Sequence, residues 1–395
     1  MSHASATATS NRSEIVIVGA GLIGAAIALW LAKHTTYSIS LIERNTVMPL
    51  PHQANQRVVA LGALATNFLD DIGVFSTLTS EHCNPYQDMF IWDENSNGEL
   101  AFNAMSVDQV CLGHMVDSQM LTYQLQQAVL SSRVDCYFDA RASKLELGRS
   151  GVSLDTELGR FDAKLLIAAD GSRSWIRQQA KIFANRKDYG QRGIVAKITS
   201  SKSHQNCAWQ RFLSTGPLAI LPLSENQSSI VWSADNALAE QLIDMDDDAF
   251  GEALSCALQG RLGDVELLSS RQSFELISLR AEQYYKRNLV LLGDAAHSIH
   301  PLAGQGANLG FKDALVLGGL IANSKSSELG SPRLLSAYQT KRQADNNQTD
   351  ALMSALHQAY KVDMPVWMLA RGLGMNSINN SRLLRNALAR QAMGL

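Results

Sequence analysis

The sequence contains little charge and no marked excess of either sign. Charged residues make up 18% of the 395 residues, below the about 25% of an average soluble domain. With 34 basic and 37 acidic residues, the formal net charge is -3. This balance excludes a global positive field for nucleic acid or an anionic membrane, so any anion must be bound locally. The 46% hydrophobic content excludes a disordered chain, and the length suits two or three packed domains.

Long apolar runs and paired cysteines are also missing. No stretch of about 18 apolar residues could span a bilayer, and the polar residues 1–13 lack the apolar core of a secretory signal peptide. The five cysteines are widely spaced and contain no C-x-x-C pair for a zinc site or a redox dithiol. We therefore expect reduced thiols in a cytoplasmic protein.

A β-α-β unit is predicted at the start of the chain. A β-branched strand at 15–18 leads through a glycine-rich turn into an apolar helical segment at 22–31, and a second strand follows at 38–42. Glu43 ends that strand, where an acid would accept hydrogen bonds from a ribose. The glycines form a G-x-G-x-x-G pattern at Gly19, Gly21 and Gly24. This combination favours binding of FAD or NAD over NADP, although the glycines could also serve tight packing alone.

Two buried strands are predicted later in the chain, and each is followed by a turn that contains an aspartate. The apolar runs 164–169 and 288–292 are typical of a parallel sheet. They end at Asp170 and Asp294, on the sheet edge where ligands of α/β folds bind. Arg177 follows the first of these turns. A purely structural alternative is equally open, in which Asp170 caps the next helix and Arg177 is solvated.

A glycine-rich loop follows the last of these strands. Residues 304–306 open an apolar helix and would present free backbone amides to an electron-rich ligand atom. Asp294 could hydrogen-bond a polyol. Asp294, His297 and His300 lie three apart, which also raises a metal site, but no further ligand cluster accompanies them. We therefore expect no metal.

Taken in order, these motifs resemble those of the flavin-dependent aromatic hydroxylases that share the para-hydroxybenzoate hydroxylase fold. The resemblance rests on the G-x-G-x-x-G turn, on D-G-x-x-S-x-x-R at 170–177 and on the G-D pair at 293–294. Within that class, H-P-L-A-G-Q-G-x-N-L-G at 300–310 is similar to the ubiquinone-biosynthesis hydroxylase family. Residues 86–93 and the last six residues are most similar to its 2-polyprenylphenol hydroxylase branch.

The resemblance implies an α/β fold with three parts. A Rossmann-like FAD-binding domain would comprise residues 14–75, 101–182 and 286–345. An inserted substrate domain with an antiparallel sheet would comprise 76–100 and 183–285, and a C-terminal helical region 346–395.

The resemblance also implies a function. NAD(P)H would reduce FAD, O2 would add to the reduced flavin, and the resulting C4a-hydroperoxide would hydroxylate the ring of a polyprenylphenol intermediate in ubiquinone biosynthesis. No second G-x-G-x-x-G is present for NAD(P)H. Two alternatives stay open: a hydroxylase of another aromatic substrate, or a non-catalytic FAD-binding subunit of a ubiquinone-biosynthesis assembly. We assign no catalytic base, because His297 and His300 are better explained as buried structural histidines.

The family's cofactor contacts transfer to this chain by position. The glycine turn and Glu43 would bind the ADP half of FAD, Arg57 its phosphates, and Asp294 its ribityl or pyrophosphate region. Asp170 and Arg177 would serve the pyrophosphate and the reductant. Ala307 replaces a larger apolar residue, which puts substrate preference in doubt. The expected contacts are Gly19, Gly21, Gly24, Glu43, Arg44, Arg57, Gln119, Asp170, Arg177, Asp294, Pro301, Gly304, Gln305, Gly306, Ala307 and Asn308.

The C-terminal segment 364–395 has four arginines and no acidic residue. Ser381 is expected to cap a helix in which Leu383, Leu384 and Leu388 share one side. This segment could contact anionic lipid, placing the protein peripherally on the cytoplasmic face of the inner membrane. Packing of a terminal helix on the FAD-binding domain is the interpretation we favour. A homo-oligomer or a ubiquinone-biosynthesis assembly is also open, and no nucleic acid partner is expected.

Overall fold

A mostly parallel sheet forms the first of two lobes of the molecule. The structure is a computed structural model that describes residues 10–51, 57–299, 304–361 and 364–394 of the chain. β1 lies at the centre of this sheet and pairs in parallel with β2 and β11. This confirms the β-α-β unit expected at the start of the chain. In spatial order the strands are β18 (Tyr285–Lys286), β19 (Leu289–Leu291), β11 (Gly159–Ala168), β1 (Ser10–Val18), β2 (Ile39–Ile42) and β8 (Asp135–Tyr137), with β9 (Ala142–Leu147) and β10 (Val152–Thr156) attached beside β11.

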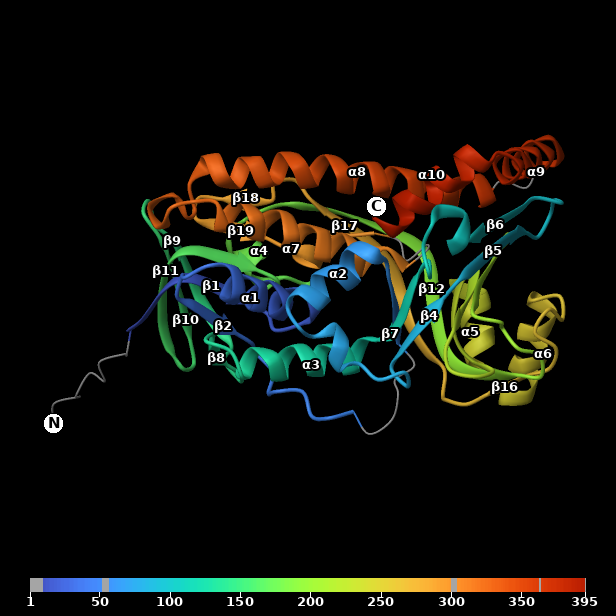
Figure 1. Ribbon diagram of the computed structural model, residues 1–395, viewed down its shortest axis with the longest axis horizontal. Helices are drawn as coiled ribbons and strands as arrows, with labels where there is room; N and C mark the ends of the chain where they lie inside the picture. Colours follow the sequence, from blue (N-terminus) through green and yellow to red (C-terminus); the bar gives the residue numbers. More distant parts are fainter. Residues whose placement is uncertain (1–9, 52–56, 300–303, 362–363, 395) are drawn as a thin grey trace.

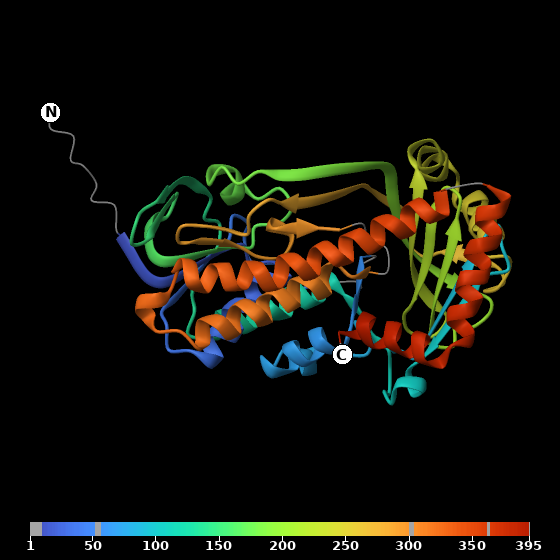
Figure 2. The same ribbon diagram turned by 90° about the horizontal axis from the view of Figure 1, so that it is seen from above.

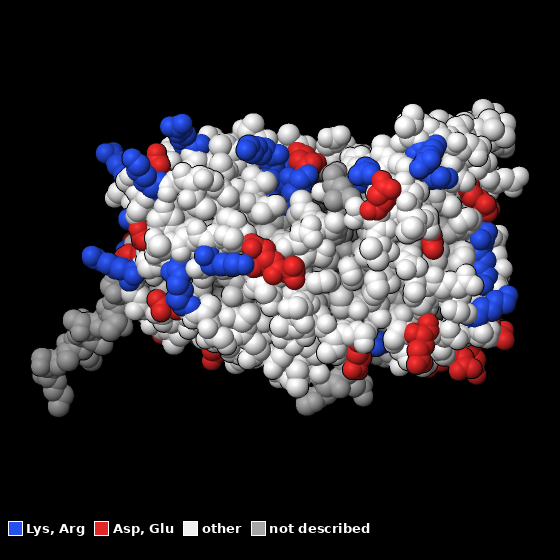
Figure 3. Space-filling view, in the orientation of Figure 1, with Lys and Arg blue, Asp and Glu red and all other residues white. Residues whose placement is uncertain are grey.

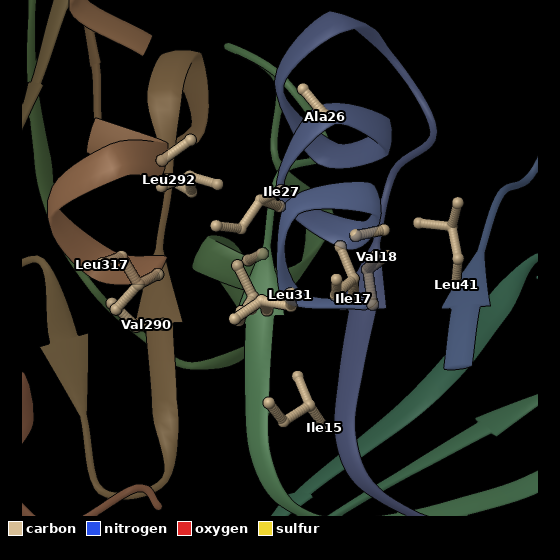
Figure 4. Packing of buried hydrophobic residues seen from close by; sticks show 14 of the residues in the cluster. Ile15, Ile17, Val18, Ala26, Ile27, Leu31, Leu41, Val290, Leu292 and Leu317 are labelled. Atoms are coloured by element: carbon tan, nitrogen blue, oxygen red, sulfur yellow. The ribbon is translucent and has the colours of Figure 1, made fainter. Parts of the chain in front are cut away.

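Helices cover this sheet and bury its apolar strands. α1 packs against α3 and α7, and Figure 4 shows Ile27 and Leu31 of α1 among side chains from β1, β19 and α7. The continuous apolar strands are buried because helices shield them, as in parallel sheets generally. The helices of this lobe are α1 (Leu22–His34), α2 (Ala63–Asp71), α3 (Ser118–Leu130), α4 (Trp175–Gln179) and α7 (Gly306–Ala322).

A larger sheet forms the second lobe, and all but one of its pairings are antiparallel; β13 and β5 are parallel. α5 (Asn236–Asp244) and α6 (Asp247–Ala257) cover one face and bury a separate apolar core, so the other face is left toward the first lobe (Figure 1). In spatial order the strands are β20 (His297–Ser298), β17 (Gln272–Ala281), β12 (Ala184–Ser200), β15 (Gln227–Asp235), β14 (Gly216–Pro222), β13 (Cys207–Leu213), β5 (Asp88–Asp93) and β6 (Glu99–Asn103), with β16 (Val265–Leu267) beside β12.

Two long strands join the lobes. β12 and β17 pair along most of their length, with a shift in register between Asp188 and Arg192, and they run from one lobe into the other in Figure 2. A small third sheet, β3 (Val58–Leu61), β7 (Gly113–Asp117) and β4 (Cys83–Tyr86), completes the sheets. The combination of a parallel sheet, an inserted antiparallel sheet and C-terminal helices confirms the expected fold class, whereas the individual domain boundaries stay a prediction.

Three C-terminal helices extend along both lobes. α8 (Pro332–Lys361) spans them, α9 (Pro365–Asn380) packs against β6, and α10 (Arg382–Met393) turns back toward α2 (Figure 2). Ser381 caps α10, since its hydroxyl accepts a hydrogen bond from the Leu384 amide, as expected. Figure 3 shows cationic and anionic side chains interspersed over a mostly uncharged face, in line with the low charge content of the sequence.

Candidate active site

A cavity of about 620 Å³ lies between the two lobes. One wall comes from the turns at the carboxyl edge of the parallel sheet, where α/β folds bind their ligands. The opposite wall is the face of the second sheet that α5 and α6 do not cover. Expected cofactor residues that line the cavity are Gly21, Arg57, Asp294, Gly304, Gly306 and Ala307. The structure therefore brings together six of the expected positions.

The three glycines of the first turn are required for different reasons. A Cβ on Gly24 would lie 1.9 Å from the Gly19 carbonyl oxygen, and one on Gly19 would lie 2.4 Å from the Ala169 carbonyl oxygen. Packing of the protein alone therefore explains Gly19 and Gly24. A Cβ on Gly21 would meet nothing within 4 Å, and Gly21 stands at the start of α1 on the cavity wall. The open space beside Gly21 fits a ligand that approaches the backbone, as a dinucleotide phosphate does.

Glu43 is bound to the glycine turn itself. One carboxylate oxygen accepts a hydrogen bond from the Ala20 amide at 2.7 Å, and the other accepts from the backbone and side chain of Asn45. Glu43 thus helps to shape the turn from the end of β2. Neither Glu43 nor the exposed Arg44 lines the described cavity. Their contact with an adenosine ribose stays a prediction.

The side chains of Asp170 and Arg177 form hydrogen bonds with backbone groups of the protein and do not line the cavity. Asp170 accepts a hydrogen bond from the Ile176 amide in the first turn of α4, and burial raises the pKa of its carboxyl. Arg177 is buried and donates to the Ala295 and Ser172 carbonyl oxygens. The cap of α4 is Ser174, whose hydroxyl accepts a hydrogen bond from the Arg177 amide. The helix-capping alternative is therefore only partly right, since Asp170 binds an amide of the first turn without being the cap and Arg177 is buried rather than solvated. Their role toward the reductant stays a prediction.

Two other arginines reach the cavity from this region. Arg173 and Arg186 are exposed and line it beside Gly171. Sequence reasoning missed both. The signal for Arg173 was its place inside the D-G-x-x-S-x-x-R motif, but nothing in the sequence marked Arg186.

Asp294 faces the cavity directly. It follows β19 in the turn Gly293–Ala295 and is exposed to the cavity. Although the side chain is open to the cavity, the protein atoms around this recess displace water and raise the pKa of the carboxyl, while the charges of His297 and Arg57 act in the opposite direction. A carboxylate in this position is suited to accept hydrogen bonds from the hydroxyl groups of a polyol chain.

The start of α7 supplies backbone to the same wall. Gly304 has a φ of +62°, and a Cβ on Gly306 would meet nothing within 4 Å. The first amides of a helix lack partners within the helix and can bind an electron-rich edge. Gln305 stands at the helix start without capping it through its side chain, and it is not among the cavity-lining residues. Pro301 and His300 lie outside the described residues.

Asn308 and Gln119 point elsewhere. The Asn308 side chain donates to the Ala60 carbonyl oxygen and accepts from the Gly62 amide, both at 2.9 Å, and so joins α7 to β3. Gln119 is exposed at the start of α3 and does not line the cavity. Two helical turns later, the buried Gln126 donates to the Ala20 carbonyl oxygen at 2.9 Å. Sequence reasoning missed Gln126, although a polar residue on the buried face of a helix was a usable signal.

A buried ionic cluster supports the Asp294 turn from behind. Asp313 of α7 has no exposed surface. It accepts hydrogen bonds from His297 at 2.5 Å, from Arg342 at 2.6 Å and from the Gly293 amide at 3.2 Å. His297 is therefore the buried, hydrogen-bonded histidine that the sequence favoured. Within the described ranges, no three His, Cys, Asp or Glu side chains gather as metal ligands.

The chain matches the family described as FAD binding domain over residues 12–350. It is 32% identical to the 3-demethoxyubiquinol 3-hydroxylase of Escherichia coli (strain K12), over 98% of this chain and 100% of that one. It is also 32% identical to the ubiquinone hydroxylase UbiL of Rhodospirillum rubrum, over 97% and 90% of the two chains.

A solved structure shares the same fold. The p-nitrophenol 4-monooxygenase PnpA of Pseudomonas putida matches with a TM-score of 0.77 and 15% identity, covering 97% of this chain and 98% of that one. From the family match and the two relatives, we conclude that the chain belongs to the FAD binding domain family and is an FAD-dependent monooxygenase.

Proposed function

We propose that this enzyme uses NAD(P)H and O2 to hydroxylate the aromatic ring of a polyprenylphenol intermediate in ubiquinone biosynthesis. The observation that carries the proposal is the shared cavity. Its first wall holds six of the positions that are expected to bind FAD, and its second wall is the mostly apolar face of a sheet. An aromatic ring on that sheet would face the flavin across the cavity.

The residues of the first wall fit FAD. Gly21 at the start of α1 would approach the diphosphate, Asp294 would bind the ribityl chain, and the backbone at 304–307 would contact the isoalloxazine edge. When bound, FAD supplies electron transfer from NAD(P)H and activation of O2. The protein's own task is to bind and orient both ligands and to keep water away from the reacting atoms.

The apolar second wall favours an uncharged ring. Ala219, Leu221 and Val231 line it from β14 and β15. Such side chains stabilise an aromatic ring and an attached prenyl chain by burial, at roughly 25 cal/mol per Å² of apolar surface. The Escherichia coli relative is named for hydroxylation of 3-demethoxyubiquinol, so a later, more substituted ring is the main alternative within this substrate class.

Product analysis under ¹⁸O2 tests the proposal. The FAD-loaded enzyme is mixed with NADH or NADPH and with 2-polyprenylphenol or 3-demethoxyubiquinol in detergent micelles. We expect one ¹⁸O atom in the ring of one product, detected by mass spectrometry. Flavin reduction without a hydroxylated product from either compound would contradict the proposed substrate class. A flavin that neither nicotinamide reduces, even with phenol present, would support the non-catalytic alternative.

We also infer that the C-terminal helices contact a lipid surface, because a polyprenylphenol resides in the bilayer. No helix in the described part of the chain is both long and apolar enough to cross a membrane. Large apolar side chains are nevertheless exposed on α9 and α10: Leu383 is 85% exposed and Val366 79%, and Trp367 and Leu369 are exposed beside them. The surface over α9 is mostly uncharged in Figure 3.

The packing of α10 leaves its leucines outside. The side that carries Leu383, Leu384 and Leu388 is exposed, whereas Ala389 and Met393 on the other side are buried in a small apolar cluster. Arg371 is buried in an ion pair with Asp93, so it does not contribute to a basic surface. The exposed leucines, which could insert into a lipid surface, therefore support membrane contact more than the arginines do.

Vesicle flotation tests this contact. The Leu383→Ser/Leu384→Ser double variant should float with phosphatidylglycerol-containing vesicles less than the wild type. Leu352→Ser, which changes another exposed leucine on α8, is the matched control and should float like the wild type. Equal flotation of all three proteins would remove the inference.

A further inference from the structure

Gln210 is a buried amide side chain on the cavity wall. It lies in the middle of β13, is 4% exposed, and lines the cavity. A glutamine side chain offers two N–H donors and one carbonyl acceptor. Among the described residues, none forms a hydrogen bond with this carboxamide. With respect to the part of the chain that the structure describes, its polar atoms are therefore available to a molecule that enters the cavity.

The alternation of β13 explains why Gln210 faces the cavity. Successive side chains of a strand point to opposite faces of the sheet. Arg211 lies on the face covered by α6, where its guanidinium donates to the Ala257 carbonyl oxygen. Ala208 and Gln210 therefore share the opposite face, and both line the cavity.

Gln210 is the polar member of a mostly apolar row across the sheet, and its partner on the other side, Ile91 of β5, is not among the cavity-lining residues. Gln210 pairs with Ala219 on β14, Ala219 pairs with Val231 on β15, and Val231 pairs with Val195 on β12. All four residues line the cavity. Ala219, the cavity-lining neighbour of Gln210, has a small side chain, so an aromatic ring that lies over this alanine would have its edge beside the carboxamide.

We propose that Gln210 determines substrate specificity by hydrogen-bonding the oxygen substituent of the substrate's aromatic ring. This assignment rests on the proposed function and names the group that recognises the phenol. A phenol hydroxyl both donates and accepts, as the carboxamide does. An analogue without that oxygen would leave the buried amide unpaired, and sites built to bind a hydroxyl discriminate strongly against such analogues.

The proposal has a signature in protein stability. A glutamine that supports the fold loses stability when it is replaced by an apolar residue of similar size. A glutamine kept for a ligand does not, because its replacement breaks no hydrogen bond with a described residue of the protein. Gln210→Leu should therefore unfold at the same or a higher temperature than the wild type. Gln126→Leu is the matched control and should unfold at a lower temperature, because Gln126 bonds the Ala20 carbonyl oxygen and the Met48 amide.

Ligand discrimination tests the assignment directly. The FAD-loaded enzyme is titrated with 2-geranylphenol and with geranylbenzene, which lacks the hydroxyl, and binding is followed by the flavin absorption spectrum. We expect the wild type to bind the phenol about 10–100-fold more tightly. Gln210→Leu should bind both compounds with similar affinity and keep its FAD. Gln210→Met provides a second apolar variant should the leucine variant fail to fold.

The outcomes separate the two claims. If the wild type discriminates and the apolar variant discriminates equally well, the assignment of Gln210 is overturned while the proposed function stands. A lower unfolding temperature together with lost FAD would show a structural role and would also overturn it. If the wild type binds neither compound, the proposed substrate class fails and the assignment fails with it.

Discussion

The Nε2 atom of His297 lies 2.5 Å from Oδ2 of Asp313, in the interior behind the Asp294 turn. The same carboxylate binds Arg342 and the Gly293 amide. Asp313 therefore connects the turn that carries Asp294 to helices α7 and α8. Because the cluster is fully buried, its members depend on one another for compensation of their charge.

The first prediction concerns the loss of this charge. Asp313→Asn leaves Arg342 buried with weaker compensation, and breaking a buried pair costs about 3–5 kcal/mol. We expect a lower unfolding temperature and weaker FAD binding, because the Gly293 amide loses its charged acceptor. Thermal unfolding and flavin fluorescence measure the two effects. If the variant is as stable as the wild type, the cluster makes no net contribution to the free energy of unfolding.

The same cluster predicts a pH dependence. Burial alone would raise the pKa of Asp313, but the charges of His297 and Arg342 hold it below its ordinary value. A carboxyl with a depressed pKa in the folded state contributes stability above its unfolded pKa of about 3.9. This stability is lost as the pH falls through the folded pKa. The free energy of unfolding of the wild type, measured in urea, should therefore decrease below about pH 4. The Asp313→Asn variant should not show this part of the decrease.

A pair of glycine variants separates cofactor binding from packing. Gly21→Ala places a methyl group in open space, so the FAD-free protein should unfold at the wild-type temperature while FAD affinity falls by about tenfold or more. Gly24→Ala should destabilise the FAD-free protein itself, because its Cβ would overlap the Gly19 carbonyl oxygen. Unchanged FAD affinity of Gly21→Ala in a fluorescence titration would argue against a ligand beside Gly21.

The sequence predicted the first sheet well because local patterns encode it. Apolar runs of strand length end at the glycine turn, at Asp170 and at Asp294, and all three turns lie at one edge of the sheet. Parallel pairing of these strands follows from burial and needs no knowledge of distant contacts. The same reasoning identified Gly21 and Asp294 as residues of one site.

Side-chain roles that depend on distant backbone could not be predicted in this way. Asn308 bonds the carbonyl oxygen of a residue 248 positions earlier, and Arg177 bonds one 118 positions later. Nothing in the local pattern distinguishes such a contact from a contact with a ligand. Gln210 shows the converse, since its neighbours in sequence are unremarkable and only the sheet register places it beside Ala219 on the cavity wall.

Replacement of Asp294 should affect protein stability and FAD binding in opposite directions. Partial loss of water in the recess between the lobes raises the pKa of the Asp294 carboxyl, so the charged form is less favourable in the folded protein than in the unfolded chain. Asp294→Asn should therefore leave the FAD-free protein as stable as the wild type or more stable at pH 7, with a smaller difference toward pH 4. FAD affinity should fall, because the amide is a weaker acceptor than a carboxylate. Equal FAD binding by both proteins would contradict its role.

The last prediction concerns the attachment of α9. Arg371 donates to both carboxylate oxygens of Asp93 on β5, at 2.8 and 3.0 Å, and both side chains are nearly inaccessible to solvent. Arg371→Met leaves the Asp93 carboxylate buried without its partner charge, and Asp93→Asn does the same to the Arg371 guanidinium, so each single variant should cost about 3–5 kcal/mol. Arg371→Met/Asp93→Asn removes both charges and should recover most of this loss, because a neutral pair needs less compensation. Urea unfolding of the two single variants and the double variant measures the coupling. Additive losses would show that the ion pair does not act as a unit in holding α9 against the second sheet.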